Sequence, residues 1–589
     1  AVHHTAFYTP YLLIATDYNF IPGYRRIVEA CHAHGAKVFG QLFHPGREVS
    51  DSMDGTAALA YAPSASPSER FRTIPCEMTV DMIDEIVEGY GQTARRMVEA
   101  GADGVEIVAS HGYLPAQFLS SSVNARADKY GGSEENRLRF IKQVIAAVRK
   151  QVGDDIVIGM RISVDEKNDA GLTQEESLTA IAALNDDLDY LSVVAGTSAT
   201  SQGATHIVPS MNFEHGYTSP LGALAKQRFS GPVIVTGRIN QPQTAEEAIK
   251  TGEADLCGMT RAMICDPEMP NKAQKGDIDD IRACIGCNQA CIGHVLKGVG
   301  VSCLQHPETG RELDYGKLEI APSPKKILVV GGGPAGMKAA EAAASRGHQV
   351  TLMEREARLG GQVLRAQLLP GREEFGGLIT NLSHEVERAG VQILCNQAVD
   401  IDVIEEHAPD EIILACGAKP YMPTIEGAEE ANIVDAWQVL DGTAKIGSSV
   451  LISDWTSDWV ALGIAEKLAR EGCKVRLAVT GASAGETLQQ YIKNMWNSKL
   501  LGLGVEMIPY ARIFGADANT VYLERTVVSE HLVVEDVDTI VIAHGHASNT
   551  ELVQQLEGGK HTVHVIGDCL APRDAEAAIF EGLKIGAII

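Results

Sequence analysis

Six short runs of β-branched and other apolar residues alternate with stretches of helical periodicity between Tyr24 and about Gly276. The runs read KVFGQL, GVEIVA, DIVIGMRIS, DYLSVVAG, PVIVTGRI and ADLCGM. This alternation is typical of a parallel sheet joined by crossover helices, and a repeat of roughly 30 to 50 residues fits an α/β protein with a (βα)8 TIM barrel. Because an open six-stranded sheet would leave both edges unpaired, we expect the chain to begin inside the barrel, with the first two strands absent.

The length and the charge of the chain narrow the possible functions. Its 589 residues exceed what one barrel of about 250 residues needs, so further domains are expected. A formal net charge of −27 disfavours nucleic acid and anionic membrane surfaces as partners. The sequence has no run of about 18 apolar residues, and its start, AVHHTAFYTPYLL, lacks the layout of a secretion signal. We therefore expect a cytoplasmic protein without nucleic-acid or membrane partners.

Four of the twelve cysteines, Cys284, Cys287, Cys291 and Cys303, lie close together in the sequence. Four thiolates can bind zinc or an iron–sulfur cluster. Zinc sites more often use two CxxC pairs on separate turns, whereas three close thiolates with a distant fourth favour a [4Fe-4S] cluster. The other cysteines are expected to pack as small hydrophobic residues. They stand at positions 31, 76, 257, 265, 395, 416, 473 and 569.

A glycine-rich turn follows the apolar run ILVV and precedes a helical stretch, and an acidic residue, Glu354, ends the next strand. This context predicts a nucleotide-binding site, because glycines let a pyrophosphate approach the backbone at a helix amino terminus. The later segments LGGQ and GD extend the prediction to FAD. The residues predicted to bind this cofactor are Gly331, Gly333, Gly336, Glu354, Gln362 and Asp568.

A second strand–helix–strand unit begins near Gly447, but its turn reads SDWTSDW instead of a glycine run. Two carboxylates would repel a pyrophosphate, and bulky side chains would block close approach, so we expect no ordinary NAD(P)H site there. The last strand and helix are expected to return to the first nucleotide-binding domain. The predicted organisation is a TIM-barrel FMN domain at 1–276, a 4Fe-4S connector at 277–323, an FAD-binding or ADP-binding domain at 324–440 and 551–589, and an inserted degenerate NAD(P)-type domain at 441–550.

The barrel carries a candidate phosphate site where two late strands end. Gly237 and Arg238 end one strand, and Gly258 and Arg261 follow the next. Barrels often bind phosphate at this place, and glycine amides with guanidinium groups suit the phosphate of FMN. The alternative is that both arginines pair with surface carboxylates.

Other polar residues stand where a flavin ring or a substrate could be reached. Gln41 and Arg161 lie at the carboxyl ends of strands, from which an inward side chain can contact an isoalloxazine ring. His44, His111 and Tyr113 occupy loops that follow such strands. On chemistry alone, each of these could equally be a structural residue.

Together, the segments GQLFHPGR, ASHGYLPAQFLSSSVNARADKYGGSEENR, GMRIS, GRI, GMTRA, CIGCNQAC and GGGPAG resemble the old yellow enzyme superfamily. The order of these motifs is similar to its three-cofactor branch, which contains 2,4-dienoyl-CoA reductase and trimethylamine dehydrogenase. The resemblance covers essentially the whole chain. It implies FMN in the barrel, a [4Fe-4S] cluster beside it, and FAD or a vestigial ADP in the carboxyl-terminal half.

The resemblance also implies roles for individual residues. Tyr113 matches the proton donor of the dienoyl-CoA reductases, and His111 matches the histidine of the amine dehydrogenases. The first member of the His-x-x-His/Asn pair of simple ene-reductases is replaced by Val108, which argues against a plain enone site. The matching flavin-binding residues are Gln41, Arg161, Gly237, Arg238, Gly258 and Arg261.

The sequence leaves three functions open. The cysteine spacing, LGGQ and LPGREEF are similar to the reductases, whereas the glycine-free turn and ALGIAEKLA are similar to the amine dehydrogenases. We expect an FMN-dependent dehydrogenase or N-demethylase that oxidises a small amine and passes electrons through the cluster to an electron-transfer flavoprotein or another redox protein. The alternatives are an NAD(P)H-dependent ene-reductase and a catalytically inactive nucleotide-sensing scaffold. We also expect a homo-oligomer.

Overall fold

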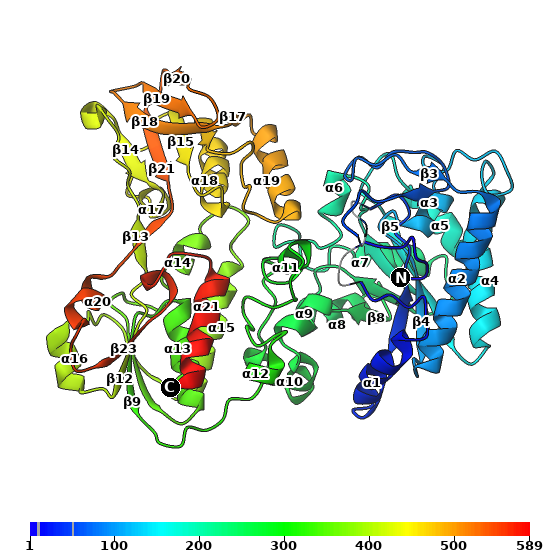
Figure 1. The fold of residues 1–589 in the computed structure, drawn as a ribbon, viewed down its shortest axis with the longest axis horizontal. Coiled ribbons are helices and arrows are strands. Elements are labelled where there is room, and N and C mark those ends of the chain that lie inside the picture. Colours follow the sequence, from blue (N-terminus) through cyan, green and yellow to red (C-terminus); the bar gives the residue numbers. More distant parts are fainter. Residues whose placement is uncertain (9–11, 50–51, 53) are drawn as a thin grey trace. The chain divides into compact units, whose positions relative to one another are not determined.

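The computed structural model describes residues 1–8, 12–49, 52 and 54–589. The chain forms two compact units, Ala1–Thr260 and Arg261–Ile589 (Figure 1). No helix among the described residues has both the length and the apolar character that crossing a membrane requires.

The first unit is built on a parallel sheet whose strands follow each other in chain order. These are the six strands predicted from the sequence, and with their connecting helices they form a curled sheet of the TIM-barrel type (Figure 1). The strands are β1 (Phe39–Leu42), β4 (Gly104–Ala109), β5 (Val157–Asp165), β6 (Tyr190–Ala195), β7 (Val233–Thr236) and β8 (Leu256–Gly258); β2 (Tyr61–Ala62) and β3 (Cys76–Glu77) form a separate pair.

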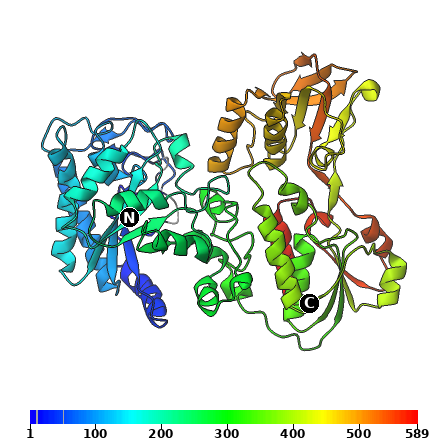
Figure 2. The ribbon, with the colours of Figure 1, turned by 180° about the vertical axis from the view of Figure 1, so that it is seen from behind.

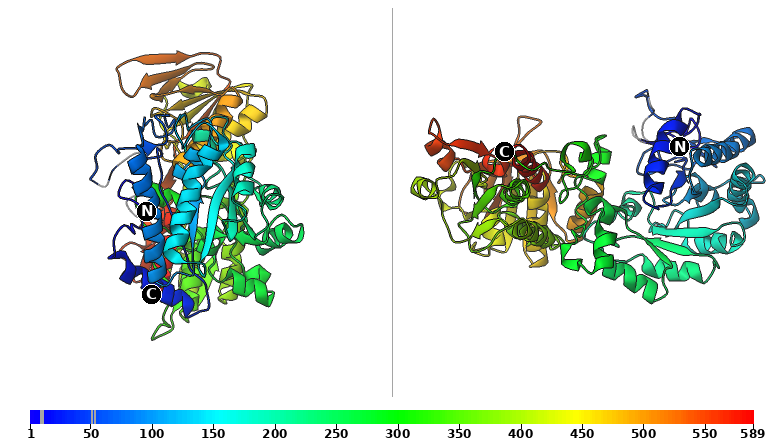
Figure 3. Two further views of the ribbon diagram at one scale, coloured as in Figure 1. Left: turned by 90° about the vertical axis from the view of Figure 1, so that its right-hand side faces the viewer. Right: turned by 90° about the horizontal axis from the view of Figure 1, so that it is seen from below.

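The strands β4 and β6 are buried at every position, which explains why their segments are almost wholly apolar. The long helices α2 and α4 pack against each other (Figure 3). Each begins at a hydroxyl N-cap, since Thr79 accepts from the Met82 N–H and Ser133 from the Asn136 N–H. The helices of this unit are α1 (Phe20–His32), α2 (Val80–Glu99), α3 (Leu114–Leu119), α4 (Glu134–Val152), α5 (Gln174–Ala183), α6 (Ser201–Ala204), α7 (Ser219–Lys226) and α8 (Pro242–Lys250), and α9 (Thr260–Cys265) leads into the second unit.

The second unit begins with short helices, and the four clustered cysteines lie in the loops between them. The elements are α10 (Met269–Lys275), η1 (Ile278–Asp280), α11 (Ile292–Leu296) and α12 (Glu312–Tyr315).

A parallel five-stranded sheet follows, in the order β11-β10-β9-β12-β23. Helices α13, α15 and α21 lie on one face, and α16 and α20 lie on the other (Figure 1). Small residues allow α13 and α21 to pack closely, because a Cβ on Gly582 would meet the Ala335 carbonyl oxygen at 2.4 Å. The elements are β9 (Lys326–Val330), α13 (Pro334–Ser345), β10 (Gln349–Met353), α14 (Val363–Ala366), α15 (Phe375–Arg388), β11 (Gln392–Leu394), α16 (Ile401–His407), β12 (Glu411–Leu414), α20 (Glu551–Leu556), β23 (Thr562–Val565), η3 (Gly567–Cys569) and α21 (Ala575–Ile588).

A second parallel sheet, in the order β14-β21-β15-β16-β17, is inserted between β12 and β23. Helices α18 and α19 pack on one face, and an antiparallel sheet of β18, β19 and β20 packs on the other (Figure 2). The antiparallel pair β13–β22 lies at the two ends of the insertion. The elements are β13 (Ala418–Pro420), η2 (Ala428–Glu430), β14 (Ile433–Asp435), α17 (Ala436–Leu440), β15 (Ser449–Asp454), α18 (Trp459–Arg470), β16 (Lys474–Val479), α19 (Gln490–Gly502), β17 (Glu506–Ile508), β18 (Ala511–Ala516), β19 (Val521–Arg525), β20 (His531–Val534), β21 (Thr539–Ala543) and β22 (His546–Ser548).

Candidate active site and cofactor sites

Polar side chains from four adjacent strands interact in the first unit. Gln41 on β1 donates from Nε2 to Oε1 of Glu106 on β4 at 2.6 Å, and the Tyr190 hydroxyl on β6 donates to Oε2 at 2.9 Å. Arg161 on β5 donates to the Ser192 hydroxyl at 3.3 Å. Gln41 and Arg161 therefore lie on strands of the same sheet, separated by β4. The hydrogen bond from Gln41 to Glu106 on β4 fixes the orientation of the Gln41 amide. Glu106 was not singled out from the sequence, because a carboxylate inside an apolar run gives no pattern of its own.

His111 has a constrained backbone and a buried ring. Its φ is +58°, its N–H donates to the Ser163 hydroxyl at 2.9 Å, and Nδ1 lies 3.3 Å from the Gly196 carbonyl oxygen. Because a carbonyl oxygen only accepts, Nδ1 carries the proton and Nε2 is the acceptor. Burial, with the charge of Arg161, lowers the pKa of His111 to about 3. The imidazole is therefore neutral near pH 7.

Tyr113 lies beside His111 as the N-cap residue of α3. Its side chain is 8% exposed. Its ring packs edge-on against Phe43 at 4.7 Å and against His111 at 6.0 Å between centroids. The two predicted catalytic residues are thus neighbours. His44 instead has both ring nitrogens bonded within the fold, to Thr5 and to the Gly46 N–H, which suits a structural residue.

The predicted phosphate loop contains two glycines that packing alone requires. A Cβ on Gly237 would lie 2.5 Å from the Thr218 side chain, and one on Gly258 would lie 2.0 Å from the Thr236 hydroxyl. Arg238 has φ +54°, is 3% exposed, and donates from Nε to the Phe213 carbonyl oxygen at 3.1 Å. Because the Arg238 guanidinium is buried, it is better placed to bind an anion inside the protein than to pair with a carboxylate on the surface.

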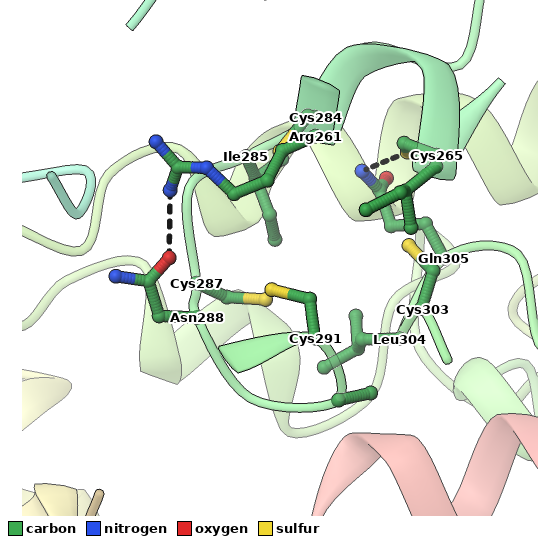
Figure 4. Close-up of a pocket in the computed structure, with 12 residues that line it drawn as sticks. Arg261, Cys265, Cys284, Ile285, Cys287, Asn288, Cys291, Cys303, Leu304 and Gln305 are labelled. Carbon is green, nitrogen blue, oxygen red and sulfur yellow. Dashed lines mark hydrogen bonds between the residues drawn. The ribbon is translucent and has the colours of Figure 1, made fainter. Parts of the chain in front are cut away.

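Arg261, the fourth residue of the predicted phosphate site, contacts the cysteine loop. It is the first residue of the second unit, and its guanidinium donates to Oδ1 of Asn288 at 2.6 Å (Figure 4). Asn288 is 1% exposed and has φ +59°. The positive charge of Arg261 lies near the Cys291 thiol, where it favours the thiolate.

The four clustered cysteines line one pocket with the apolar side chains of Ile264, Ile285 and Leu304 (Figure 4). Each sulfur also receives a hydrogen bond from a backbone N–H. Such N–H donors and an apolar lining suit an iron–sulfur cluster, whose sulfurs carry negative charge. The donors are Gly286 for Cys284, Gln289 for Cys287, Ile292 for Cys291, and Gln305 and His306 for Cys303.

Burial also raises the cost of charging these thiols without a metal. Desolvation raises the pKa of Cys287 well above its ordinary value and that of Cys291 to about 11. Metal binding supplies positive charge that keeps such sulfurs as thiolates. The donor set therefore fits a thiolate-bound metal centre.

The glycine turn after β9 packs closely against the neighbouring backbone and leaves space for a nucleotide on its other side. Gly331 has φ +109°, and a Cβ there would lie 2.3 Å from the Ala415 carbonyl oxygen. A Cβ on Gly336 would lie 1.9 Å from the Gly331 carbonyl oxygen, so both positions require glycine for packing. At Gly333 the nearest atom would be the Gly361 Cα at 4.0 Å. Gly333 therefore leaves open space in front of the turn, which an adenine dinucleotide could fill.

The acidic residue at the end of β10 is tied to the same turn. Glu354 accepts from the Gly332 N–H at 2.7 Å and from the Glu356 N–H at 2.8 Å. Gln362 and Asp568 meet on the same side of the sheet, with the Gln362 amide donating to the Asp568 carboxylate at 2.7 Å. The predicted dinucleotide-binding residues thus gather at the carboxyl end of β9.

The turn between β15 and α18 uses its acids to bond its own backbone. Oδ1 of Asp454 accepts from the Ser457 N–H at 2.8 Å, and Asp458 caps α18 by accepting from the Val460 N–H at 2.8 Å. Burial and the nearby Asp458 raise the pKa of Asp454 to about 7. Two amides at the start of α18, those of Ser457 and Val460, are therefore already bonded to these carboxylates.

The two indoles of this turn have different surroundings. Trp455 is 49% exposed, whereas Trp459 stacks under the Arg372 guanidinium at 3.7 Å and packs edge-on against Trp496 at 5.4 Å. Trp459 is therefore half-buried and packs against the core of the domain, whereas Trp455 is largely exposed to solvent.

Comparisons with known proteins agree with this arrangement. Residues 11–280 match the NADH:flavin oxidoreductase / NADH oxidase family, and residues 325–582 match the pyridine nucleotide-disulphide oxidoreductase family. A metal reductase of Desulforamulus reducens is 35% identical, over 96% of this chain and 88% of the relative. The chain belongs to the NADH:flavin oxidoreductase / NADH oxidase family. The predicted assignment to the three-cofactor branch of the old yellow enzyme superfamily is confirmed.

Two further relatives of this flavin-dependent oxidoreductase have different named substrates. An N,N-dimethylglycine/sarcosine dehydrogenase of Chromohalobacter salexigens is 33% identical, over 97% of this chain and 88% of the relative. A 2-naphthoyl-CoA reductase structure aligns with a TM-score of 0.91 at 28% identity, covering 100% of this chain and 90% of that one. The TIM-barrel and Rossmann-like fold is confirmed, and the first family match implies FMN, while the second implies FAD or NAD.

Proposed function

We propose that this family member is an FMN-dependent and [4Fe-4S]-dependent dehydrogenase or N-demethylase that oxidises a small amine. Its electrons would leave through the cluster to a protein acceptor, such as an electron-transfer flavoprotein. The observation that carries this proposal is the turn at Asp454–Asp458, whose two carboxylates accept hydrogen bonds from the N–H groups of Ser457 and Val460. A chain with this turn has no ordinary pyrophosphate site for NAD(P)H in its second nucleotide fold.

The proposal assigns each cofactor to a set of residues. FMN, when bound, accepts a hydride equivalent from a C–H bond next to nitrogen, and the cluster carries single electrons. Gln41 and Arg161 would contact the flavin ring, and Gly237, Arg238, Gly258 and Arg261 would bind its phosphate. The four clustered cysteines would hold the [4Fe-4S] centre. Gly331, Gly333, Gly336, Glu354, Gln362 and Asp568 would bind FAD, or ADP in its place. We also propose the domain boundaries 1–276, 277–323, 324–440 with 551–589, and 441–550.

The neutral charge state of His111 agrees with an amine substrate. Hydride loss from an amine needs the neutral form, whose nitrogen lone pair stabilises the developing cation. The nearby Arg161 cation disfavours binding of an ammonium ion, and a neutral His111 can accept a hydrogen bond from the substrate. Nε2 of His111 is placed to accept a hydrogen bond from the substrate, since Nδ1 is bonded to Gly196.

One observation favours the ene-reductase as a second candidate. The Tyr113 phenol is buried and packed beside His111, as a proton donor to a substrate carbon would be. The similar 2-naphthoyl-CoA reductase, and the NADH in the name of the family, also agree with that reaction. A nicotinamide could reach FMN directly, without the second nucleotide fold.

Anaerobic stopped-flow mixing separates the two candidates. We expect N,N-dimethylglycine, sarcosine or a related small amine to bleach the flavin absorbance, and NADH and NADPH to do so slowly. At an effective dielectric constant of about 20, one carboxylate about 5 Å from a pyrophosphate charge costs about 3 kcal/mol, more than a hundredfold in affinity. Bleaching within milliseconds by micromolar NADPH would contradict the dehydrogenase proposal and support the ene-reductase.

A further inference from the structure

The sheet of the first unit has one apolar face and one polar face. On β4, Val105 and Ile107 belong to the hydrophobic core, and Glu106 between them lies on the other face. On β1, a Cβ on Gly40 would lie 2.1 Å from the sulfur of a methionine on α2, so Gln41 faces away from that helix. The face turned away from the helices therefore carries polar side chains.

Four neighbouring strands place Gln41, Glu106, Gly159 and Tyr190 in one row across the polar face. Glu106 pairs in register with Gln41 on β1 and with Gly159 on β5, and Gly159 pairs with Tyr190 on β6. A Cβ on Gly159 would lie 2.1 Å from the Tyr190 ring, so only glycine lets this ring cross β5. The Tyr190 hydroxyl then donates to Oε2 of Glu106 at 2.9 Å, which fixes the carboxylate from the side of β6.

The other oxygen of Glu106 fixes the amide of Gln41. Nε2 of Gln41 donates to Oε1 of Glu106 at 2.6 Å. A flipped amide would set its oxygen against a carboxylate oxygen, so the amide has one orientation. The Gln41 side chain is exposed, whereas Glu106 is buried. A ligand can therefore contact the oxygen and the second N–H of the Gln41 amide, while Glu106 acts on that ligand through Gln41 and through its charge.

Arg161 brings the opposite charge to the same face. It pairs in register with Val108, two residues after Glu106, so it lies one row nearer to the carboxyl ends of the strands. The carboxyl ends of barrel strands form the active-site face. A flavin ring held there by Gln41 and Arg161 would lie near a positive and a negative charge, which act in opposite directions on any charge that the ring gains.

We propose that Glu106 is a positioning residue that sets how Gln41 meets the FMN ring and that lowers the reduction potential of FMN. The inference rests on FMN in the barrel, which is part of the proposed function, but not on the amine substrate. A flavin ring has an N3–H group between two carbonyl oxygens, so an amide held in one orientation can offer it an acceptor and a donor together. Two-electron reduction leaves an anionic ring near pH 7, and a nearby carboxylate disfavours that charge.

The test uses the full chain loaded with FMN, without an amine. We expect Glu106→Gln to raise the FMN midpoint potential by about 30 mV, a tenfold change in the reduction equilibrium of a two-electron couple. FMN should also bind up to about tenfold more weakly, because one of the two oxygens that accept from Gln41 and Tyr190 becomes an N–H donor.

Two titrations measure these changes. A potentiometric titration of FMN-loaded protein, with FMN-free protein subtracted, gives the potential, and a titration of deflavinated protein with FMN gives the affinity. Glu246→Gln, at an exposed position on α8, makes the same chemical change outside the sheet and should alter neither quantity.

Two further variants separate charge from positioning. Glu106→Asp keeps the charge on a side chain that is one methylene shorter, so its potential should stay close to that of the wild type while FMN binds more weakly. In a Gln41→Leu background, Glu106→Gln should no longer weaken FMN binding, because the amide that Glu106 orients is absent.

Several results would overturn the inference. These are an unchanged or lower potential in Glu106→Gln, a rise in Glu106→Asp as large as that in Glu106→Gln, and an equal loss of FMN affinity with and without the Gln41 amide. Wild-type protein that binds no FMN would reject the inference together with the barrel cofactor. A flavoprotein that shows the expected shifts but oxidises no amine would support the inference and reject only the proposed dehydrogenase.

Discussion

The amide of Gln362 donates to the carboxylate of Asp568 at 2.7 Å, although 206 positions separate the two residues in the chain. The contact joins the loop after β10 to η3 beside the glycine turn. Both side chains are thereby held where the proposed dinucleotide would lie. We expect Gln362→Leu to weaken flavin retention in the carboxyl-terminal half by about tenfold, since it removes one hydrogen bond to a charged group. The measurement is FAD or ADP content after dialysis.

Gln554→Leu is the control for this change, because Gln554 is exposed on α20. Equal nucleotide retention in both variants would contradict a binding role for the Gln362–Asp568 pair.

The four clustered cysteines are predicted to act as one metal centre. Replacing Cys284, Cys287, Cys291 or Cys303 by Ala should remove iron and sulfide without unfolding the first unit, since the sulfurs lie outside its core. Iron and sulfide analysis with circular dichroism checks this. Stoichiometric zinc in anaerobically purified protein would reject the cluster.

Arg238 is predicted to bind the FMN phosphate. Arg238→Ala removes a charge-assisted contact worth about 1.5–3 kcal/mol, so FMN should bind roughly tenfold to a hundredfold more weakly. Titration of the deflavinated protein with FMN measures this change. Arg228→Ala, at an exposed position after α7, should leave the affinity unchanged. If both variants bind FMN equally, Arg238 has no role in the phosphate site.

Tyr113 separates the two candidate reactions. General acid catalysis contributes about a hundredfold to ten-thousandfold, so Tyr113→Phe should abolish most ene-reduction. Amine oxidation needs no proton donated to carbon, and we expect it to fall by less than about tenfold. Steady-state rates with an amine and with an activated alkene make this comparison. A loss of a hundredfold or more in amine oxidation would place Tyr113 in that reaction as well.

Asp454 is predicted to make stability depend on pH. Burial raises its folded pKa from 3.8 to about 7, and Oδ2 has no hydrogen-bond partner among the described residues. As pH rises from about 4 to 7 the unfolded chain loses this proton first, so stability falls over that window. Asp454→Asn should remove the effect, which amounts to at most about 4 kcal/mol.

Thermal unfolding at pH 5 and pH 7.5 provides the measurement. The melting temperature of Asp454→Asn relative to the wild type should be higher at pH 7.5 than at pH 5. Asp536→Asn is the control, because Asp536 is exposed on the same domain and its φ of +57° suits asparagine. An Asp454→Asn difference that does not change with pH would mean that the buried carboxyl is charged throughout.

The sequence by itself determined the strand order of the first unit and the glycine turn after β9. These features arise from local periodicity and from positions where only glycine fits, such as Gly331 and Gly336. It also predicted the four clustered cysteines as a set, because they lie close along the chain. The residues that form each of these patterns lie within a few tens of positions of one another in the sequence.

Only the tertiary structure decided which distant side chains meet. The side chains of Gln362 and Asp568, of Gln41 and Glu106, and of Gln305 and Cys265 come from separate segments that carry no common pattern. Likewise, Trp459 was expected to block a nucleotide, but it is half-buried and packs against Arg372 and Trp496. Local propensity sets which elements form, whereas the burial of apolar surface between elements selects their neighbours, and that selection depends on the whole chain at once.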